Sequence, residues 1–238
     1  MCYSSHEESE KESIKIINHL KYSIMARLSS GIFGPIHGKL GSVVGAVWKQ
    51  TPYLRTIPSE KTEGLKATPA QIACREKFKF VQEWLVPFHP YVTIGFKNYA
   101  KDKTEINAAF SKNYREATVG VYPDLSIDYT KVILSKGRLP QLNQIKAEVT
   151  SSNSINLTWE RNYNDDSCFD DQLMLIAYNR ELKIVDGFVG GCNRCDLKCE
   201  HSLDPKLIGK SLDIYVSVIS LNGKRISDSK YLGKLDPL

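Results

Sequence analysis

The chain has 238 residues, of which 42% are hydrophobic and 25% are charged, and its formal net charge at pH 7 is +5. These values are typical of globular proteins and exclude a collagen-like or intrinsically disordered chain. No apolar run approaches the ~20 residues that a transmembrane helix needs, so a helical membrane span is excluded and we expect a cytoplasmic protein.

The first 24 residues differ in character from the rest. They lack the basic start, apolar core and small-residue cleavage site of a secretory signal. The composition then changes sharply at Met25, where MARLSSGIFG begins. We therefore expect residues 1–24 to be a non-native or disordered leader and Met25 to be the natural start.

Residues 25–120 are predicted to form a glycine-rich hairpin and helical unit. Glycines stand at positions 31, 34, 38, 41 and 45, a density that favours tight turns and close approach of the backbone. The segments SVVGAVWKQ and YLRTI, on either side of Thr51-Pro52, predict the two strands of a β-hairpin.

Two helices should follow the hairpin. Thr68, Pro69 and Gln71 have the order of an N-cap, a first helical residue and the third position of a capping box. An apolar stripe then recurs at helical spacing, at Cys74, Phe78, Val81 and Leu85. Thr104 is the predicted N-cap of the second helix. We expect both helices to pack on each other and on the hairpin.

From residue 121 the apolar period changes from helical to two. SINLTWE alternates, and QLMLIAY is a nearly continuous β run, which is typical of a central strand. Leu212 to Val218 alternate up to Asn222-Gly223, a strong hairpin signal. LSIDY and KVILS also favour strands. Residues 121–238 are therefore predicted to form an antiparallel β-sandwich of the fibronectin type III or immunoglobulin type.

The positive charge is concentrated in one segment. Residues 25–120 contain 14 Lys and Arg against 7 Asp and Glu, whereas residues 121–238 contain 15 against 16. This asymmetry fits either a solvated surface or an anionic partner. The aromatic and basic side chains that could bind a single nucleic-acid strand are Trp48, Lys49, Tyr53, Arg55, Arg75, Lys77 and Lys79. However, we expect one or both of Trp48 and Tyr53 to belong to the core of so small a unit.

The motif GCNRCDLKCEH contains three cysteines and a histidine. These residues, Cys192, Cys195, Cys199 and His201, have the number and kinds of ligands that a tetrahedral zinc site needs. Their spacing is not that of paired CxxC motifs, and cysteines on an ordinary strand would give the same pattern. We expect reduced thiols and no cofactor, with zinc as the alternative.

No pattern in the sequence predicts catalysis. GPIHGKL has three residues between its glycines where a phosphate loop needs four. The histidines His37, His89 and His201 lie in unrelated contexts, without a nucleophile elbow nearby. We therefore expect a protein that is not an enzyme.

Several segments together resemble a bacterial domain-of-unknown-function family of about this size. They are MARLSSGIFGPIHGKLGSVVGAVWK, TPAQIACREKF, IGFKNYA, NAAF and SDSKYLGKL. The resemblance runs from Met25 nearly to the C-terminus and implies no activity, cofactor or catalytic residue. The cysteine-rich segment around Cys192 to His201 departs from the family pattern.

The predicted fold class is α+β, with the hairpin and two helices followed by the sandwich. The favoured function is a non-enzymatic interaction or assembly protein that binds another macromolecule, with a protein partner or self-assembly preferred. The first alternative is nucleic-acid binding through residues 25–120, and a metal-supported or enzymatic role comes third.

Overall fold

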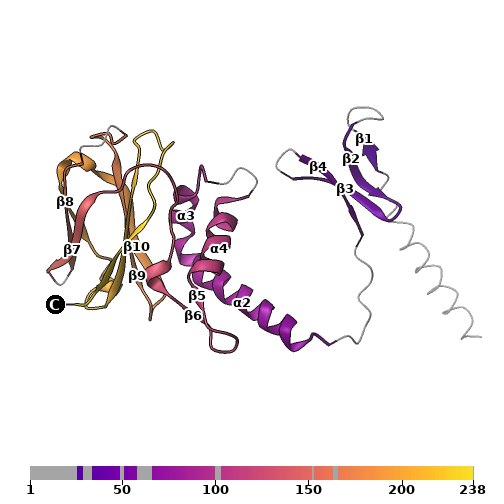
Figure 1. The fold of residues 1–238 in the computed structure, drawn as a ribbon, viewed down its shortest axis with the longest axis horizontal. Coiled ribbons are helices and arrows are strands. Elements are labelled where there is room, and N and C mark those ends of the chain that lie inside the picture. Colours follow the sequence, from indigo (N-terminus) through magenta and orange to yellow (C-terminus); the bar gives the residue numbers. More distant parts are fainter. Residues whose placement is uncertain are drawn as a thin grey trace, which may run out of the picture. The chain divides into compact units, whose positions relative to one another are not determined.

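The computed structural model describes residues 26–28, 34–48, 51–57, 66–99, 103–151, 153–162 and 166–237. Two compact units divide the chain between Leu65 and Lys66 (Figure 1). The predicted leader of residues 1–24 and the predicted contact residue Lys49 lie outside the described residues. No helix in the described ranges is long and apolar enough to cross a membrane.

The N-terminal unit is an antiparallel four-stranded sheet with the strand order β1-β2-β3-β4. Its strands are β1 (Arg27–Leu28), β2 (Ile36–Leu40), β3 (Val43–Trp48) and β4 (Thr51–Thr56). The predicted hairpin is confirmed as the β3–β4 pair, although Thr51 and Pro52 belong to β4 and not to the turn. The glycine-rich segment before it supplies β2, a strand that was not predicted.

Two positions of this sheet require glycine, one because of its backbone conformation and one because of a close backbone contact. Gly41 has φ +59° in the turn between β2 and β3, a conformation that side chains with a Cβ rarely adopt. Gly45 lies under the chain at Ile36, because a Cβ at this position would stand 1.9 Å from the Ile36 carbonyl oxygen. The chain at Ile36 therefore crosses one face of β3 in close backbone contact.

The second unit begins with three helices: α2 (Pro69–Leu85), α3 (His89–Gly95) and α4 (Glu105–Glu116). The predicted capping box is confirmed. The backbone N–H of Gln71 donates to Thr68 Oγ1, and the backbone N–H of Thr68 donates to Gln71 Oε1. Thr104 also caps α4 as predicted, accepting from the Asn107 amide. The short helix α3, which contains Pro90 and ends at Gly95, was not predicted.

The apolar stripe of α2 is only half buried. Val81 and Leu85 are fully packed, with Trp84 beside them, whereas Cys74 and Phe78 stay exposed. The Phe78 ring lies instead against Phe110 of α4, with 4.6 Å between ring centroids. The C-terminal half of α2 is therefore the part that anchors the helix.

A seven-stranded β-sandwich completes this unit, as predicted. One sheet has the order β11-β8-β7 and the other the order β10-β9-β12-β13. Their bounds are β7 (Asn143–Ser151), β8 (Ser154–Glu160), β9 (Gln172–Asn179), β10 (Ile184–Asn193), β11 (Lys198–Ser202), β12 (Leu212–Ile219) and β13 (Lys230–Leu235). The predicted strands LSIDY and KVILS differ: only Ser126–Ile127 (β6) is a strand, paired with Thr118–Val119 (β5).

The four-stranded sheet of the sandwich, β10-β9-β12-β13, has a hydrophobic core on each of its faces. Leu173, Leu175 and Ala177 of β9 point into the sandwich, where they join Leu157 and Trp159. The alternate residues of the same strand pack on the helices instead, and they are Met174, Ile176 and Tyr178. The larger unit therefore has three layers: a sheet, a second sheet and the helices (Figure 1).

The unit boundary consequently differs from the predicted one at residue 120. The helices were expected to pack on the glycine-rich hairpin, but their core includes Tyr178 and Tyr215 of the sandwich. Phe88, between α2 and α3, touches Tyr178 with 4.8 Å between ring centroids. The physical reason is that the helix-side face of β9 and β12 is apolar and needs a cover.

This packing predicts that Val81→Ala destabilises the whole second unit. The Val81 side chain is fully buried in the core that the helices share with β9 and β12, so its truncation should lower the free energy of unfolding by about 2 kcal/mol. Val86→Ala is the matched control, because Val86 is 53% exposed. Urea denaturation followed by circular dichroism measures both. Equal effects of the two substitutions would contradict the three-layer packing.

Candidate functional site

The structure does not assemble the predicted zinc site. Cys192 at the end of β10 and Cys199 on β11 form a disulfide, with 6.2 Å between their Cα atoms. A sulfur in a disulfide is not available as a thiolate ligand. The expectation of reduced thiols is also corrected for these two residues, because the chain crosses here from one sheet to the other and brings them together.

The other two members of the motif have separate surroundings. Cys195 is a free, exposed thiol on the short 3₁₀ helix Arg194–Asp196. His201 Nε2 lies 3.1 Å from Asp186 Oδ2 on β10, a strand of the other sheet. The four predicted ligands are thus divided among a disulfide, a lone thiol and a histidine–carboxylate contact.

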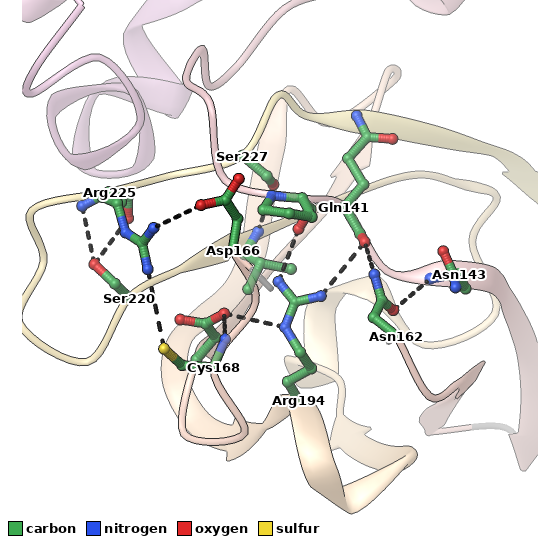
Figure 2. A network of polar contacts seen from close by, with 12 residues as sticks. Gln141, Asn143, Asn162, Asp166, Cys168, Arg194, Ser220, Arg225 and Ser227 are labelled. Carbon is green, nitrogen blue, oxygen red and sulfur yellow. Dashed lines mark hydrogen bonds and ion pairs between the residues drawn. The ribbon is translucent and has the colours of Figure 1, made fainter. Parts of the chain in front are cut away.

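Arg194, in the middle of the cysteine motif, holds together one end of the sandwich (Figure 2). Its Nε donates to Asp171 Oδ2 at 3.1 Å, and its Nη2 donates to the Pro140 carbonyl at 2.7 Å. Its own carbonyl accepts from Trp159 Nε1 at 2.8 Å. We call Arg194, Asp171 and the carbonyls of Pro140 and Gln141 the Arg194 clasp.

The two charged side chains of the clasp are buried. The side chains of Arg194 and Asp171 are only 5% and 0% exposed. Burial lowers the pKa of the Arg194 guanidinium, and the Asp171 carboxylate opposes that shift. The pair joins the loop before β7, the loop before β9 and the crossover after β10. Its chemistry is therefore that of a structural brace.

The sequence did not reveal this pair. Asp171 is fully buried although it stands in a polar segment of the sequence. Arg194 stands among the cysteines of the motif, where no local pattern marks it as the partner of Asp171.

One group of described residues has the geometry of a metal site. Ligand atoms of Cys168, Asp170 and Asp171 lie within 4.8 Å of one another. However, Arg194 contacts Asp171, and Arg225 Nη2 approaches Cys168 Sγ at 3.9 Å. Two neighbouring guanidinium groups repel a cation, so we assign no metal to this group.

The N-terminal sheet presents a second candidate site. Residues directly opposite each other on antiparallel strands share a face, and here Val44 is opposite both Lys39 and Arg55. Tyr53 is opposite Ala46, and Trp48 is opposite Thr51, on this same face. We call Lys39, Trp48, Tyr53 and Arg55 the cationic–aromatic face.

Both aromatic rings of this face are accessible. Trp48 is 53% exposed and Tyr53 is 44% exposed, whereas the sequence had suggested that at least one could be core. They stay outside because the chain at Ile36 crosses the opposite face of β3, over Gly45. Three of the four predicted hairpin contacts, Trp48, Tyr53 and Arg55, thus share one face.

The predicted helix contacts lie in the other unit, on α2. Lys77 Nζ stands 4.5 Å from the centroid of the Tyr114 ring, a cation–π contact. Lys79 approaches Glu83 at 3.9 Å. Of the three predicted helix cations, only Arg75 has no interaction with another described side chain.

These features define the class of this protein: an α+β chain with a helix-backed sandwich of the fibronectin type III or immunoglobulin type, preceded by a small sheet. The model of DUF6266, a family of unknown function, matches residues 35–233, and the chain belongs to this family. The resemblance seen in the sequence is thereby confirmed. No curated protein matches the sequence.

Among solved structures, domains d3-d4 of the rat CD45 extracellular region are similar to this chain. The match has a TM-score of 0.31 and 16% identity, and it covers 83% of this chain and 96% of that one. So slight a likeness carries no functional inference.

We expect mass spectrometry to find the Cys192–Cys199 disulfide directly. Trypsin cleaves at Arg194 and Lys198, so a linked pair of peptides should appear until reductant is added, while Cys195 reacts with an alkylating agent. Replacing Cys192 and Cys199 by Ala should lower the free energy of unfolding by about 2–3 kcal/mol, because the unfolded chain then gains the entropy that the closed loop denies it. Cys195→Ser is the control and should leave the free energy of unfolding unchanged, because Cys195 is a free thiol. One zinc per chain that depends on Cys195 would instead restore the predicted metal site.

The Arg194 clasp predicts a large cost for Arg194→Ala. This substitution leaves the buried Asp171 carboxylate unpaired, which should lower the free energy of unfolding by about 3–5 kcal/mol. Arg225→Ala is the control, since Arg225 faces the exposed Asp166 at 4.0 Å and should contribute at most about 1 kcal/mol. Adding Asp171→Asn to Arg194→Ala should recover part of the loss. Identical losses for the two arginine variants would refute the assignment.

Proposed function

We propose that this protein is a non-enzymatic interaction protein that binds another macromolecule, preferably a protein, through its N-terminal sheet. The observation that carries the proposal is the cationic–aromatic face, where two large rings and two cations are exposed side by side. Tyr, Trp and Arg are the residues that most often supply the binding energy of protein interfaces.

The two units suit a division of roles. The second unit has two hydrophobic cores and a buried brace, so it serves as the stable scaffold. The first unit is small, and every side chain of β4 is exposed. Exposed apolar side chains also lie on the other face of this sheet, where Leu40 is 60% and Leu54 is 59% exposed. Groups of exposed apolar side chains are typical of binding surfaces.

Nucleic-acid binding is the second candidate, favoured by the same face. Aromatic rings can stack on bases while Lys39 and Arg55 contact phosphates. The described cations of the sheet are few for this task, and the helix cations Lys77 and Lys79 already contact other side chains. A protein partner therefore ranks first.

The test compares wild type with the variant Trp48→Ala, Tyr53→Ala, Arg55→Gln. We expect affinity purification from the source cells to retain a protein on wild type but not on this variant, and we expect nuclease treatment to leave the retention unchanged. The control variant, Phe169→Ala with Lys198→Gln, removes an exposed ring and a cation from the other unit and should behave like wild type. Melting curves check that all three proteins are folded.

A single-stranded oligonucleotide separates the two candidates. If the face served nucleic acid, binding would be tight, would weaken steeply as salt rises and would fail in the triple variant. Our proposal expects only weak binding, lost at physiological salt. Sub-micromolar binding at that salt, abolished in the triple variant alone, would replace the protein-binding proposal by the nucleic-acid one.

A further inference from the structure

A second surface of interest is a hollow in the larger unit, far in sequence from the cationic–aromatic face. Its volume is about 510 Å³, and its walls are Asn98 and Tyr99, residues 136–138 and residues 224–226. The first wall follows α3, and the last belongs to the loop between β12 and β13. A volume of several hundred Å³ is that of a typical small-ligand site.

The walls of this hollow are strongly basic. Lys136, Arg138, Lys224 and Arg225 line it, and Lys97 reaches toward the loop at Gly223, with Nζ 3.9 Å from where a Cβ would lie. We call this hollow the basic pocket.

Only part of this charge is neutralised. Lys136 forms an ion pair with Asp228. Figure 2 shows that Arg225 also approaches Asp166, at 4.0 Å. The side chains of Lys97, Arg138 and Lys224 make no hydrogen bond or ion pair with any described residue. Cations that line one hollow repel one another, and a bound anion relieves that repulsion.

The walls are fixed in place by contacts that do not use these charges. Asn98 Nδ2 donates to the Lys224 carbonyl at 2.5 Å, which ties the turn after α3 to the loop. The Leu139 amide donates to the Ile226 carbonyl at 3.0 Å, and Gly137 lies so close to Ile226 that a Cβ would stand 2.0 Å from its oxygen. The backbone segments that carry the basic side chains are therefore held together before any ligand arrives, so a ligand need not assemble the walls of the pocket.

We propose that the basic pocket binds a small ligand that carries phosphate. Both Arg138 and Lys224 line the hollow. A guanidinium has the planar donor fork that matches phosphate oxygens, and a lysine ammonium adds a point charge. The Tyr99 ring, 42% exposed, offers an apolar surface for the organic part of such a ligand. This site is independent of the proposed function, because it uses neither the N-terminal sheet nor a macromolecular partner.

The test titrates the full chain with inorganic pyrophosphate by isothermal calorimetry at moderate salt. We expect one site per chain with a Kd below about 1 mM. Arg138→Gln with Lys224→Gln should raise the Kd at least about tenfold, since it removes both unpaired wall charges and no internal contact. Citrate, an anion of similar charge without phosphate, should bind more weakly than pyrophosphate.

The matched control is Lys146→Gln with Lys198→Gln. These lysines lie opposite Thr158 on the exposed face of the three-stranded sheet, so the pair removes the same charge from another place. The control should bind pyrophosphate like wild type. The proposal is overturned if wild type shows no saturable binding up to about 10 mM, if both double variants weaken it equally, or if citrate binds as tightly.

Discussion

The structure of the larger unit depends on the burial of β9 and β12 on both faces. Each strand sends alternate side chains into two different cores, one between the sheets and one under the helices. Such strands cannot face water on either side, so the sheet requires two covers. The three-stranded sheet β11-β8-β7 and the helices α2 to α4 supply these covers, and the fold is the consequence of that requirement.

Burial on both faces also forces polar groups to find partners inside the protein. The Asp213 carboxylate, 1% exposed, accepts two hydrogen bonds from Arg180 at 2.5 and 2.6 Å and one from Tyr231 at 2.7 Å. Burial and this carboxylate raise the pKa of Tyr231 to about 12. Tyr215 Oη donates a hydrogen bond to the Tyr129 carbonyl, which ties the short 3₁₀ helix Tyr129–Lys131 to β12. In the Arg194 clasp the buried guanidinium likewise has its partner inside the protein, the Asp171 carboxylate.

The elements that the sequence predicts well are those with local causes. The capping box of Thr68 and Gln71 is complete within four residues, and the apolar run of β9 reflects its own burial. The pairing of Asp171 with Arg194 joins residues that are distant in sequence, so no local pattern could indicate it. The cationic–aromatic face could be predicted only in part. The sequence indicated Trp48, Tyr53 and Arg55 but not Lys39, and only the strand register shows that these four side chains share a face.

The three-layer packing also determines where this chain can be divided. A fragment cut at residue 120 would carry a complete sandwich by strand count, yet it would leave Met174, Ile176, Tyr178 and Tyr215 without their helices. An apolar sheet face of that kind promotes aggregation in solution. The smallest fragment suitable for biophysical work therefore begins near Lys66, and a hybrid protein that borrows this sandwich must borrow its helices as well.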